Sequence, residues 1–324
     1  MTEMESTVAK EFQVAMAGGS PTMKSFIGRN AKKLIDWDAF PASRGYPELA
    51  RAQIRYIGAG GAYEKANDPS TLATGNFTLS IVTQMPGCYA ASHFHECKEA
   101  FLALGGTLTV GWAYGDEVVE AQLGYKDMCL NSVGRPHGFR NDGAVPVIAS
   151  IMVGAKNPLP PQYVCHPSEV PTEVARHFGA TPDKVHTLDE SSDDFRHQDL
   201  ARHIVRYSQQ RPLWEPAGFA RLVYIGDGGA PPGSYQMDLV HLPKGCGVQL
   251  YEREVEDVYF VLEGVVTAGW EENGRIYEER LGPKDVIFNP AGRLHYFRND
   301  GVEDAQFMMV IGSPKPEKVT FKAA

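Results

Sequence analysis

The stretch SHFHECKEAFLALGG, residues 92–106, holds two histidines one residue apart and a glutamate four residues after the second of them. Residues i and i+2 of a β-strand point to the same face, so His93 and His95 should project together. Glu99 opens the next apolar run, and a turn between the two strands would bring its carboxylate beside the imidazoles. Imidazole and carboxylate groups are common metal ligands, so the stretch predicts a metal site.

A second stretch, GRPHGFRN (134–141), offers His137 as a fourth ligand from a more distant strand. Taken alone, an H-x-H pair favours a different interpretation, in which the two histidines are exposed and His137 is a turn residue. Four candidate ligands together favour the metal site. Strand alternation should also place Phe101 and Ala103 on the side of Glu99, and Phe139 on the side of His137, as an apolar wall or as ordinary barrel filling.

The chain contains an internal repeat. The segment GWAYGDEVVEAQLGYKDMCLNSVGRPHGFRNDG (111–143) aligns without a gap with GWEENGRIYEERLGPKDVIFNPAGRLHYFRNDG (269–301), at an offset of 158. Upstream, RYIGAGGAY (55–63) aligns with VYIGDGGAP (223–231) at an offset of 168. Two copies of one domain explain both matches.

Short runs with alternating or β-branched residues, such as FTLSIVTQ (77–84), are separated by glycine, proline and asparagine in both copies. This pattern predicts an all-β sandwich or barrel. Helical patterns occur in the N-terminal arm and in PTEVARHFGA (171–180) and DLARHIVRYS (199–208) of the connector. The predicted organisation is an arm (1–50), a metal-binding domain (51–155), a connector (156–215), a second domain (216–315) and a tail (316–324).

From Gly87 the first stretch reads G-x5-H-x-H-x3-E-x6-G, and from Gly134 the second reads G-x2-H-x3-N. These patterns resemble the two signature motifs of the cupin superfamily, whose members are small jelly-roll barrels. With the repeat, the chain resembles a bicupin over approximately residues 50–155 and 215–315. Carried over residue by residue, the resemblance implies one divalent metal ion held by His93, His95, Glu99 and His137.

The size and layout resemble those of gentisate-type bicupins, which cleave aromatic or enolisable substrates with Fe(II) and O2. The resemblance therefore implies an Fe(II)-dependent dioxygenase acting on a small aromatic or enolisable substrate. Gentisate-type sites have three histidines, whereas this chain retains Glu99, as oxalate-acting and flavonol-cleaving cupins do. The alternatives are a non-redox lyase, isomerase or cyclase in which Glu99 is the catalytic base, and a small-molecule-binding cupin with a structural metal. Mn(II), Ni(II), Co(II) and Zn(II) also suit these ligands.

The second copy has lost most of the ligand set. At the offset of 158, His93 corresponds to Tyr251, His95 to Arg253 and Glu99 to Asp257, and His137 alone has a histidine counterpart, His295. Arginine is permanently cationic, so it can replace the charge of a metal ion beside an aspartate. We expect Arg253, Asp257 and His295 to form a structural cluster in a metal-free domain. An anion pocket built on Arg253 is the alternative, and a buried guanidinium is usually already paired.

The bulk composition excludes several classes of function. The 324 residues carry a formal net charge of −9, with basic residues interspersed among acidic ones, so a nucleic acid partner is not expected. No segment has the roughly 20 consecutive apolar residues that a membrane span needs, and the acidic start does not resemble a signal peptide. The five scattered cysteines predict reduced thiols, with only Cys97 near the site. We expect a cytoplasmic homo-oligomer that acts on a small molecule.

Overall fold

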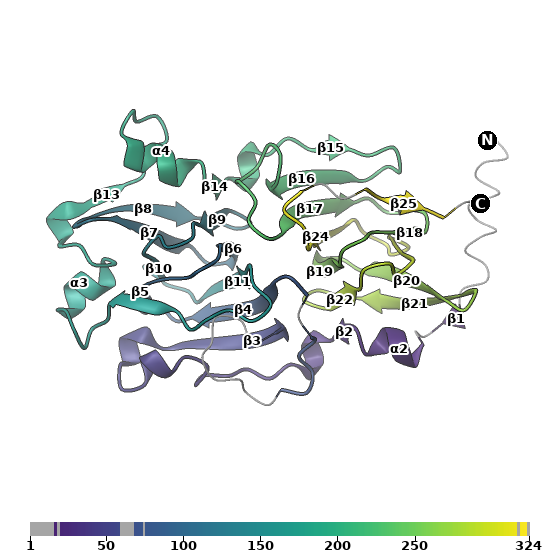
Figure 1. Ribbon diagram of the computed structural model, residues 1–324, viewed down its shortest axis with the longest axis horizontal. Helices are drawn as coiled ribbons and strands as arrows, with labels where there is room; N and C mark the ends of the chain where they lie inside the picture. Colours follow the sequence, from purple (N-terminus) through teal and green to yellow (C-terminus); the bar gives the residue numbers. More distant parts are fainter. Residues whose placement is uncertain (1–15, 18–19, 59–67, 74, 316–317, 323–324) are drawn as a thin grey trace. The chain divides into compact units, whose positions relative to one another are not determined.

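The computed structural model describes residues 16–17, 20–58, 68–73, 75–315 and 318–322. As expected for an all-β protein, most of the ordered elements are strands (Figure 1). The chain divides into two compact units, Lys33–Gln210 with Val223–Gln236, and Met1–Lys32 with Arg211–Leu222 and Met237–Ala324. We call the strand frameworks of these units the first and the second barrel.

The first barrel consists of two six-stranded sheets that enclose one apolar core. One sheet has the order β12 (Gln162–Cys165), β5 (Tyr89–Phe94), β10 (His137–Arg140), β7 (Leu108–Tyr114), β8 (Glu117–Leu123) and β13 (Val185–Thr187). The other has the order β14 (Ile204–Val205), β9 (Met128–Asn131), β6 (Glu99–Gly105), β11 (Val147–Val153), β4 (Thr78–Gln84) and β3 (Arg51–Ile57). The core contains Phe101, Trp112 and Phe139, and each such buried side chain contributes about 1.5–3 kcal/mol.

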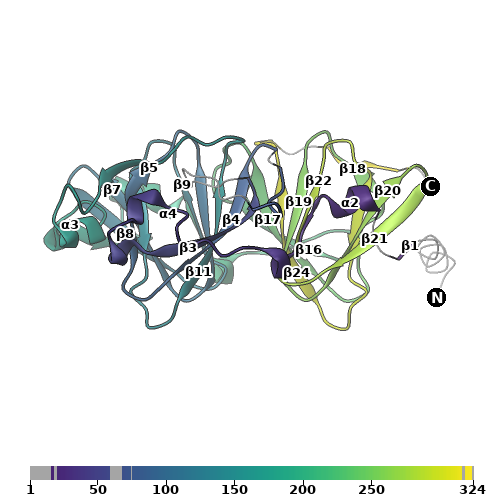
Figure 2. The same cartoon turned by 90° about the horizontal axis from the view of Figure 1, so that it is seen from below.

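Connector segments complete the edges of both sheets. Strand β12 pairs with β5, β13 pairs with β8, and β14 pairs with β9. Helix α3 (Thr172–Arg176) lies beside β5 and α4 (Phe195–Ala201) beside β8 (Figures 1 and 2). Pairing of the edge strands satisfies backbone groups that an open sheet would expose.

The helix predicted over residues 199–208 is wrong for most of its length. Helix α4 begins four residues earlier, where the Asp194 side chain accepts a hydrogen bond from the Arg196 amide, and it ends at Ala201. An N-terminal cap of this kind determines where a helix starts. The β-branched residues Ile204 and Val205 instead form β14 against β9. The helix predicted within residues 171–180 is present as α3.

The second barrel repeats this architecture. One sheet has the order β1 (Met16–Ala17), β21 (Arg275–Leu281), β20 (Val266–Glu272), β23 (His295–Arg298), β18 (Tyr251–Glu252) and β25 (Thr320–Phe321). The other has the order β15 (Leu213–Trp214), β16 (Ala220–Ile225), β17 (Gln236–Leu242), β24 (Ala305–Ile311), β19 (Asp257–Glu263), β22 (Val286–Asn289) and β2 (Ile27–Gly28). Helix α2 (Pro21–Lys24) lies on this barrel (Figure 2), and Phe26 just after it packs on Trp270.

Short 3-10 helices account for much of the remaining local order. They are η2 (Asn30–Lys32), η3 (Pro41–Ser43), η4 (Pro47–Leu49), η5 (Pro182–Lys184) and η6 (Tyr207–Gln209). Within its described residues, 16–17 and 20–50, the N-terminal arm therefore consists of the short helix α2, the two-residue strands β1 and β2, three 3-10 turns and irregular segments rather than long helices.

Equivalent polar contacts recur in the two barrels at the offset of 158. The Trp112 indole donates to Asn131 at 2.8 Å, and the Trp270 indole donates to Asn289 at 2.6 Å. In the same way, Arg140 pairs with Glu120 in the first barrel, and Arg298 pairs with Glu278 in the second. Both arginines therefore have the shared structural role that their repeated positions suggest.

Gly111 of β7 and Gly138 of β10 lie directly opposite each other, and the Phe178 ring of the connector packs on both. A Cβ atom at Gly111 would overlap that ring. We expect Gly111→Ala to lower the free energy of unfolding by about 1–3 kcal/mol through overpacking, as measured by urea denaturation. Gly105→Ala is the control, since its Cβ would lie 3.7 Å from Ile148. An equal effect of both variants would contradict the prediction.

Candidate metal centre

Three strands of the first barrel bring the predicted ligands together. His93 lies near the end of β5 and His95 just beyond it, whereas Glu99 begins β6 and His137 begins β10. The antiparallel pairing of β10 with β5 places His137 directly opposite His93. The turn between β5 and β6 returns Glu99 to the same end of the barrel, as the spacing predicts.

We call His93, His95, Glu99 and His137 the ligand cluster; all four side chains are buried. Their potential ligand atoms all lie within 4.8 Å of one another. The Glu99 Oε2 atom lies 2.9 Å from His137 Nε2, 3.5 Å from His95 Nε2 and 3.7 Å from His93 Nε2. Ligands bonded to one ion at roughly 2.0–2.2 Å have comparable mutual separations, so the cluster fits a single metal ion.

Backbone carbonyls orient two of the imidazoles. His93 Nδ1 lies 2.8 Å from the Ala91 carbonyl oxygen, and His137 Nδ1 lies 2.7 Å from that of Arg135. A carbonyl oxygen only accepts, so each Nδ1 carries the proton and donates it. In the neutral ring the Nε2 atom then has the free lone pair. Such outer hydrogen bonds are typical of metal-binding histidines, because they fix both tautomer and ring orientation.

The electrostatics of the cluster favour the neutral forms of His93 and His95 and the ionised form of Glu99. Burial lowers the pKa of His93 and that of His95. Burial alone would raise the pKa of Glu99, but His95, His137 and His93 together outweigh it and hold this pKa well below its usual range. A divalent cation requires ligands in these protonation states.

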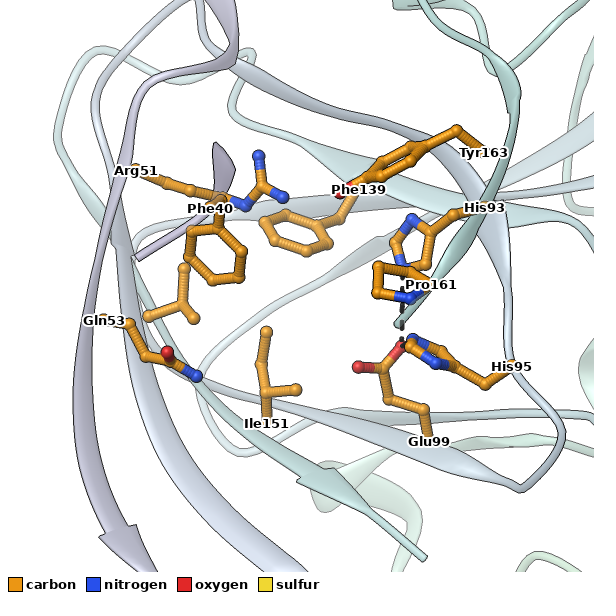
Figure 3. Close-up of a pocket in the computed structure, with 11 residues that line it drawn as sticks. Phe40, Arg51, Gln53, His93, His95, Glu99, Phe139, Ile151, Pro161 and Tyr163 are labelled. Carbon is orange, nitrogen blue, oxygen red and sulfur yellow. Dashed lines mark ion pairs between the residues drawn. The ribbon is translucent and has the colours of Figure 1, made fainter. Parts of the chain in front are cut away.

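A cavity of about 30 Å³ adjoins the ligand cluster (Figure 3). It has room for about two or three water molecules. Figure 3 shows one carboxylate oxygen of Glu99 at the ion pair with the histidines and the other turned toward the cavity. Phe139 lines the cavity as expected, together with Val82 and Ile151. Phe101 and Ala103 do not line the cavity. The Phe101 ring packs on the rings of His137 and Phe139, and Ala103 lies in the core.

Sequence reasoning missed the opposite wall of the cavity. It is formed by residues far from the motifs in sequence, namely Phe40, Arg51, Gln53, Pro161 and Tyr163. Burial lowers the pKa of Arg51. Arg51 and Gln53 lie two residues apart, so the alternation of side chains along β3 places both on one face of the strand. Nothing in the sequence showed that this face points into the barrel.

The second barrel has a hydrogen-bonded cluster at the equivalent place. The Asp257 Oδ2 atom accepts from Tyr251 at 2.7 Å and from Arg253 at 3.0 Å, and it lies 3.4 Å from His295 Nε2. The Tyr251 hydroxyl also bonds the Tyr259 hydroxyl, which the sequence reasoning did not include. We call these five residues the Asp257 cluster. The Arg253 guanidinium supplies the positive charge beside the carboxylate, so Arg253 does not form a free anion pocket.

Cys97 is not part of the ligand cluster, and burial raises the pKa of its thiol to about 12. Across the ranges that the structure describes, the ligand cluster is the one group of three or more histidine, cysteine or acidic residues with this geometry. The seven other histidines, at 166, 177, 186, 197, 203, 241 and 295, lie outside it. Of the helices in the described ranges, none is long and apolar enough to cross a membrane.

Comparisons with known proteins agree with the two-barrel fold. The family described as "Cupin domain" matches residues 238–311, which lie in the second barrel. No curated protein sequence matches the chain.

The chain is structurally similar to two oxalate decarboxylases. One is the formate complex of the Lactobacillus farciminis enzyme, with 12% identity, a TM-score of 0.61 and coverage of 91% of this chain and 88% of that one. The other is a single-residue variant of the B. subtilis enzyme, with 13% identity, a TM-score of 0.65 and coverage of 95% and 81%. With two repeated barrels, a cupin domain match in the second of them and structural similarity over nearly its whole length, this chain has the fold of a bicupin.

Proposed function

We propose that the first barrel is the active site of a metal-dependent enzyme for a small organic substrate, with His93, His95, Glu99 and His137 as the metal ligands. The observation that carries this proposal is the convergence of three Nε2 atoms and one carboxylate oxygen beside a cavity. The second barrel, whose corresponding residues bond to one another, is proposed to be structural.

For the reaction, our first candidate is an Fe(II)-dependent dioxygenase that cleaves a small aromatic or enolisable substrate. A bound Fe(II) ion would orient substrate and O2 and take up developing negative charge. The chain's own contribution is to hold the imidazoles by hydrogen bonds from Nδ1 and to limit access of water with Phe40, Phe139 and Ile151. A dry site strengthens every electrostatic interaction within it.

The second candidate is a non-redox lyase, isomerase or cyclase. Its support is Glu99, whose second carboxylate oxygen faces the cavity and is placed to accept a proton from a bound substrate. The two structurally similar proteins are named as decarboxylases, which favours carbon–carbon bond cleavage without a net redox change. Here Mn(II), Ni(II) or Zn(II) would suit the ligand set as well as Fe(II) does.

Metal analysis followed by oxygen measurements tests this proposal. The protein is purified anaerobically without a metal-affinity column, and its metals are quantified by elemental analysis. We expect about one divalent ion per chain. Oxygen uptake with diphenols or diketones would support the dioxygenase, and turnover of keto acids or sugar acids without oxygen uptake would support the lyase. No bound metal, or two ions per chain, would contradict the single-site proposal. A metal-saturated protein without turnover on all of these substrates would instead indicate a binding protein.

A further inference from the structure

Arg51 of β3 is a buried cation in the wall of the cavity. It lines the cavity together with His93, His95 and Glu99, and only 4% of its surface is exposed. Figure 3 shows its guanidinium directed into the space in front of these residues. This side chain therefore faces the place where a substrate would bind.

The partners of Arg51 are neutral groups. Its guanidinium donates to the Leu49 carbonyl at 3.1 Å and lies 4.0 Å from the centre of the Phe40 ring. Glu99 lines the same cavity and makes its ion-pair contacts with the histidines. Among the described residues, no acidic side chain forms an ion pair with Arg51. A guanidinium withdrawn from water without an anionic partner is energetically unfavourable.

The other two buried arginines of the described chain do have such partners. Arg55, on the same strand, pairs with Asp36 at 2.8 Å, and Arg140 pairs with Glu120 and Asp142. These two charges are neutralised within the protein. Arg51 thus differs from them because, among the described residues, it lines a cavity without forming an ion pair to any acidic side chain.

Gln53, two residues further along β3, adds a second unsatisfied polar group. Its Nε2 donates to Ser80 at 3.1 Å, while its Oε1 is buried in the cavity wall without a hydrogen bond. Buried polar groups normally have partners; an amide oxygen only accepts, so this one calls for a donor such as a water molecule in the cavity and does not itself indicate an anion. The amide and the guanidinium lie on the same face of the strand.

The second barrel provides an internal comparison. At the offset of 168, Gln53 corresponds to Arg221, which pairs with Asp238 at 2.7 Å. Ser80, the partner of Gln53, corresponds to Asp238 at the offset of 158, so a side-chain contact between these two strands is present in both barrels. At the offset of 168, Arg51 corresponds to Phe219, which packs on the Phe297 ring at 5.2 Å. The barrel that lacks the ligand cluster has a phenyl ring where the first barrel has a cation.

We propose that Arg51 binds an anionic oxygen of the substrate while other substrate oxygens face the ligand cluster, so that the substrate is a short carboxylate. The planar guanidinium suits a carboxylate, because two of its N–H groups can donate in parallel. The small volume of the cavity, about 30 Å³, suits a short acid rather than a large ligand. This inference rests on the proposed metal site and adds the charge and size of its ligand.

Binding measurements on the Mn(II)-loaded protein test the proposal without relying on turnover. Isothermal titration is performed with pyruvate and malonate, and with their neutral amides. We expect Arg51→Gln to weaken carboxylate binding about 10- to 100-fold, since a charge-assisted hydrogen bond is lost, and to leave amide binding unchanged. Arg51→Lys, which keeps the charge but not the planar fork, should be intermediate. Arg202→Gln, at an arginine whose side chain is 73% exposed, should match the wild type.

The failures of the two proposals are distinguishable. If the wild-type protein takes up no metal, the proposed metal site fails, and this proposal fails with it. If Arg51→Gln binds one Mn(II) per chain and binds carboxylates as tightly as the wild type, the Arg51 assignment alone is overturned. Should Arg51→Gln fail to fold, the comparison of Arg51→Lys with the wild type decides the outcome, because unchanged carboxylate affinity in that variant contradicts recognition by the guanidinium fork.

Discussion

Replacement of His137 with alanine is expected to abolish stoichiometric metal binding and to reduce turnover to background. His137 is one of the four proposed ligands, and its Nε2 makes the shortest contact within the ligand cluster, 2.9 Å to Glu99 Oε2. Even residues that only hydrogen-bond to metal ligands alter metal affinity by about 10- to 100-fold. We therefore expect an affinity loss of more than about 100-fold, measured by elemental analysis and by competition with a chelator.

His295→Ala is the matched control, because His295 occupies the same position in the second barrel. Its Nδ1 donates to the Arg293 carbonyl as that of His137 does to the Arg135 carbonyl. If the metal is held in the first barrel, the folded His295→Ala protein should retain about one ion per chain. Equal metal content in both variants would refute the assignment of the site to the first barrel. Circular dichroism confirms in each case that the variant is folded.

Replacement of Arg253 with methionine is expected to destabilise the protein by about 3–5 kcal/mol. The change leaves the fully buried Asp257 carboxylate without its cationic partner, and an uncompensated buried charge has a cost of this order. Tyr251 and His295 still contact the carboxylate, which favours the lower end of the range. Urea denaturation measures the loss of unfolding free energy.

A double-mutant cycle then isolates the interaction. Arg253→Met combined with Asp257→Leu removes both charges, so the double variant should be more stable than the sum of the two single effects predicts. Additive effects, with no coupling free energy, would contradict a stabilising pair.

The pH dependence of the same variant gives an independent check. Burial would raise the pKa of Asp257, but Arg253 and then His295 more than compensate, and the pKa lies below its ordinary value. The ionised pair therefore contributes its full stability above about pH 4, the pKa of an unfolded aspartate, and this contribution is lost as the pH falls through the folded pKa. The difference in stability between wild type and Arg253→Met should accordingly shrink as the pH is lowered below 4. A difference independent of pH would show that the carboxylate charge is not involved.

The ligand cluster was predictable because its geometry is mostly local. Alternation along β5 puts His93 and His95 on one face, and a single turn returns Glu99. The stretch GRPHGFRN then supplied His137, and the repeat identified the substitutions in the second copy. The Asp257 cluster was predicted only in part, since Tyr251 and Tyr259 contribute hydroxyl groups whose contacts depend on packing.

The all-β class, the duplication and the four residues of the ligand cluster could be predicted from the sequence, because strand periodicity and fixed spacing encode them directly. The burial of Arg51 beside that cluster without an ion pair, in contrast to Arg55 on the same strand, became apparent only from the packing of the folded chain. The same packing places Tyr163 of the connector in the cavity wall. These contacts join segments that are distant in the chain. The burial of a side chain and the charge of its neighbours depend on how those segments pack, which residue spacing does not specify.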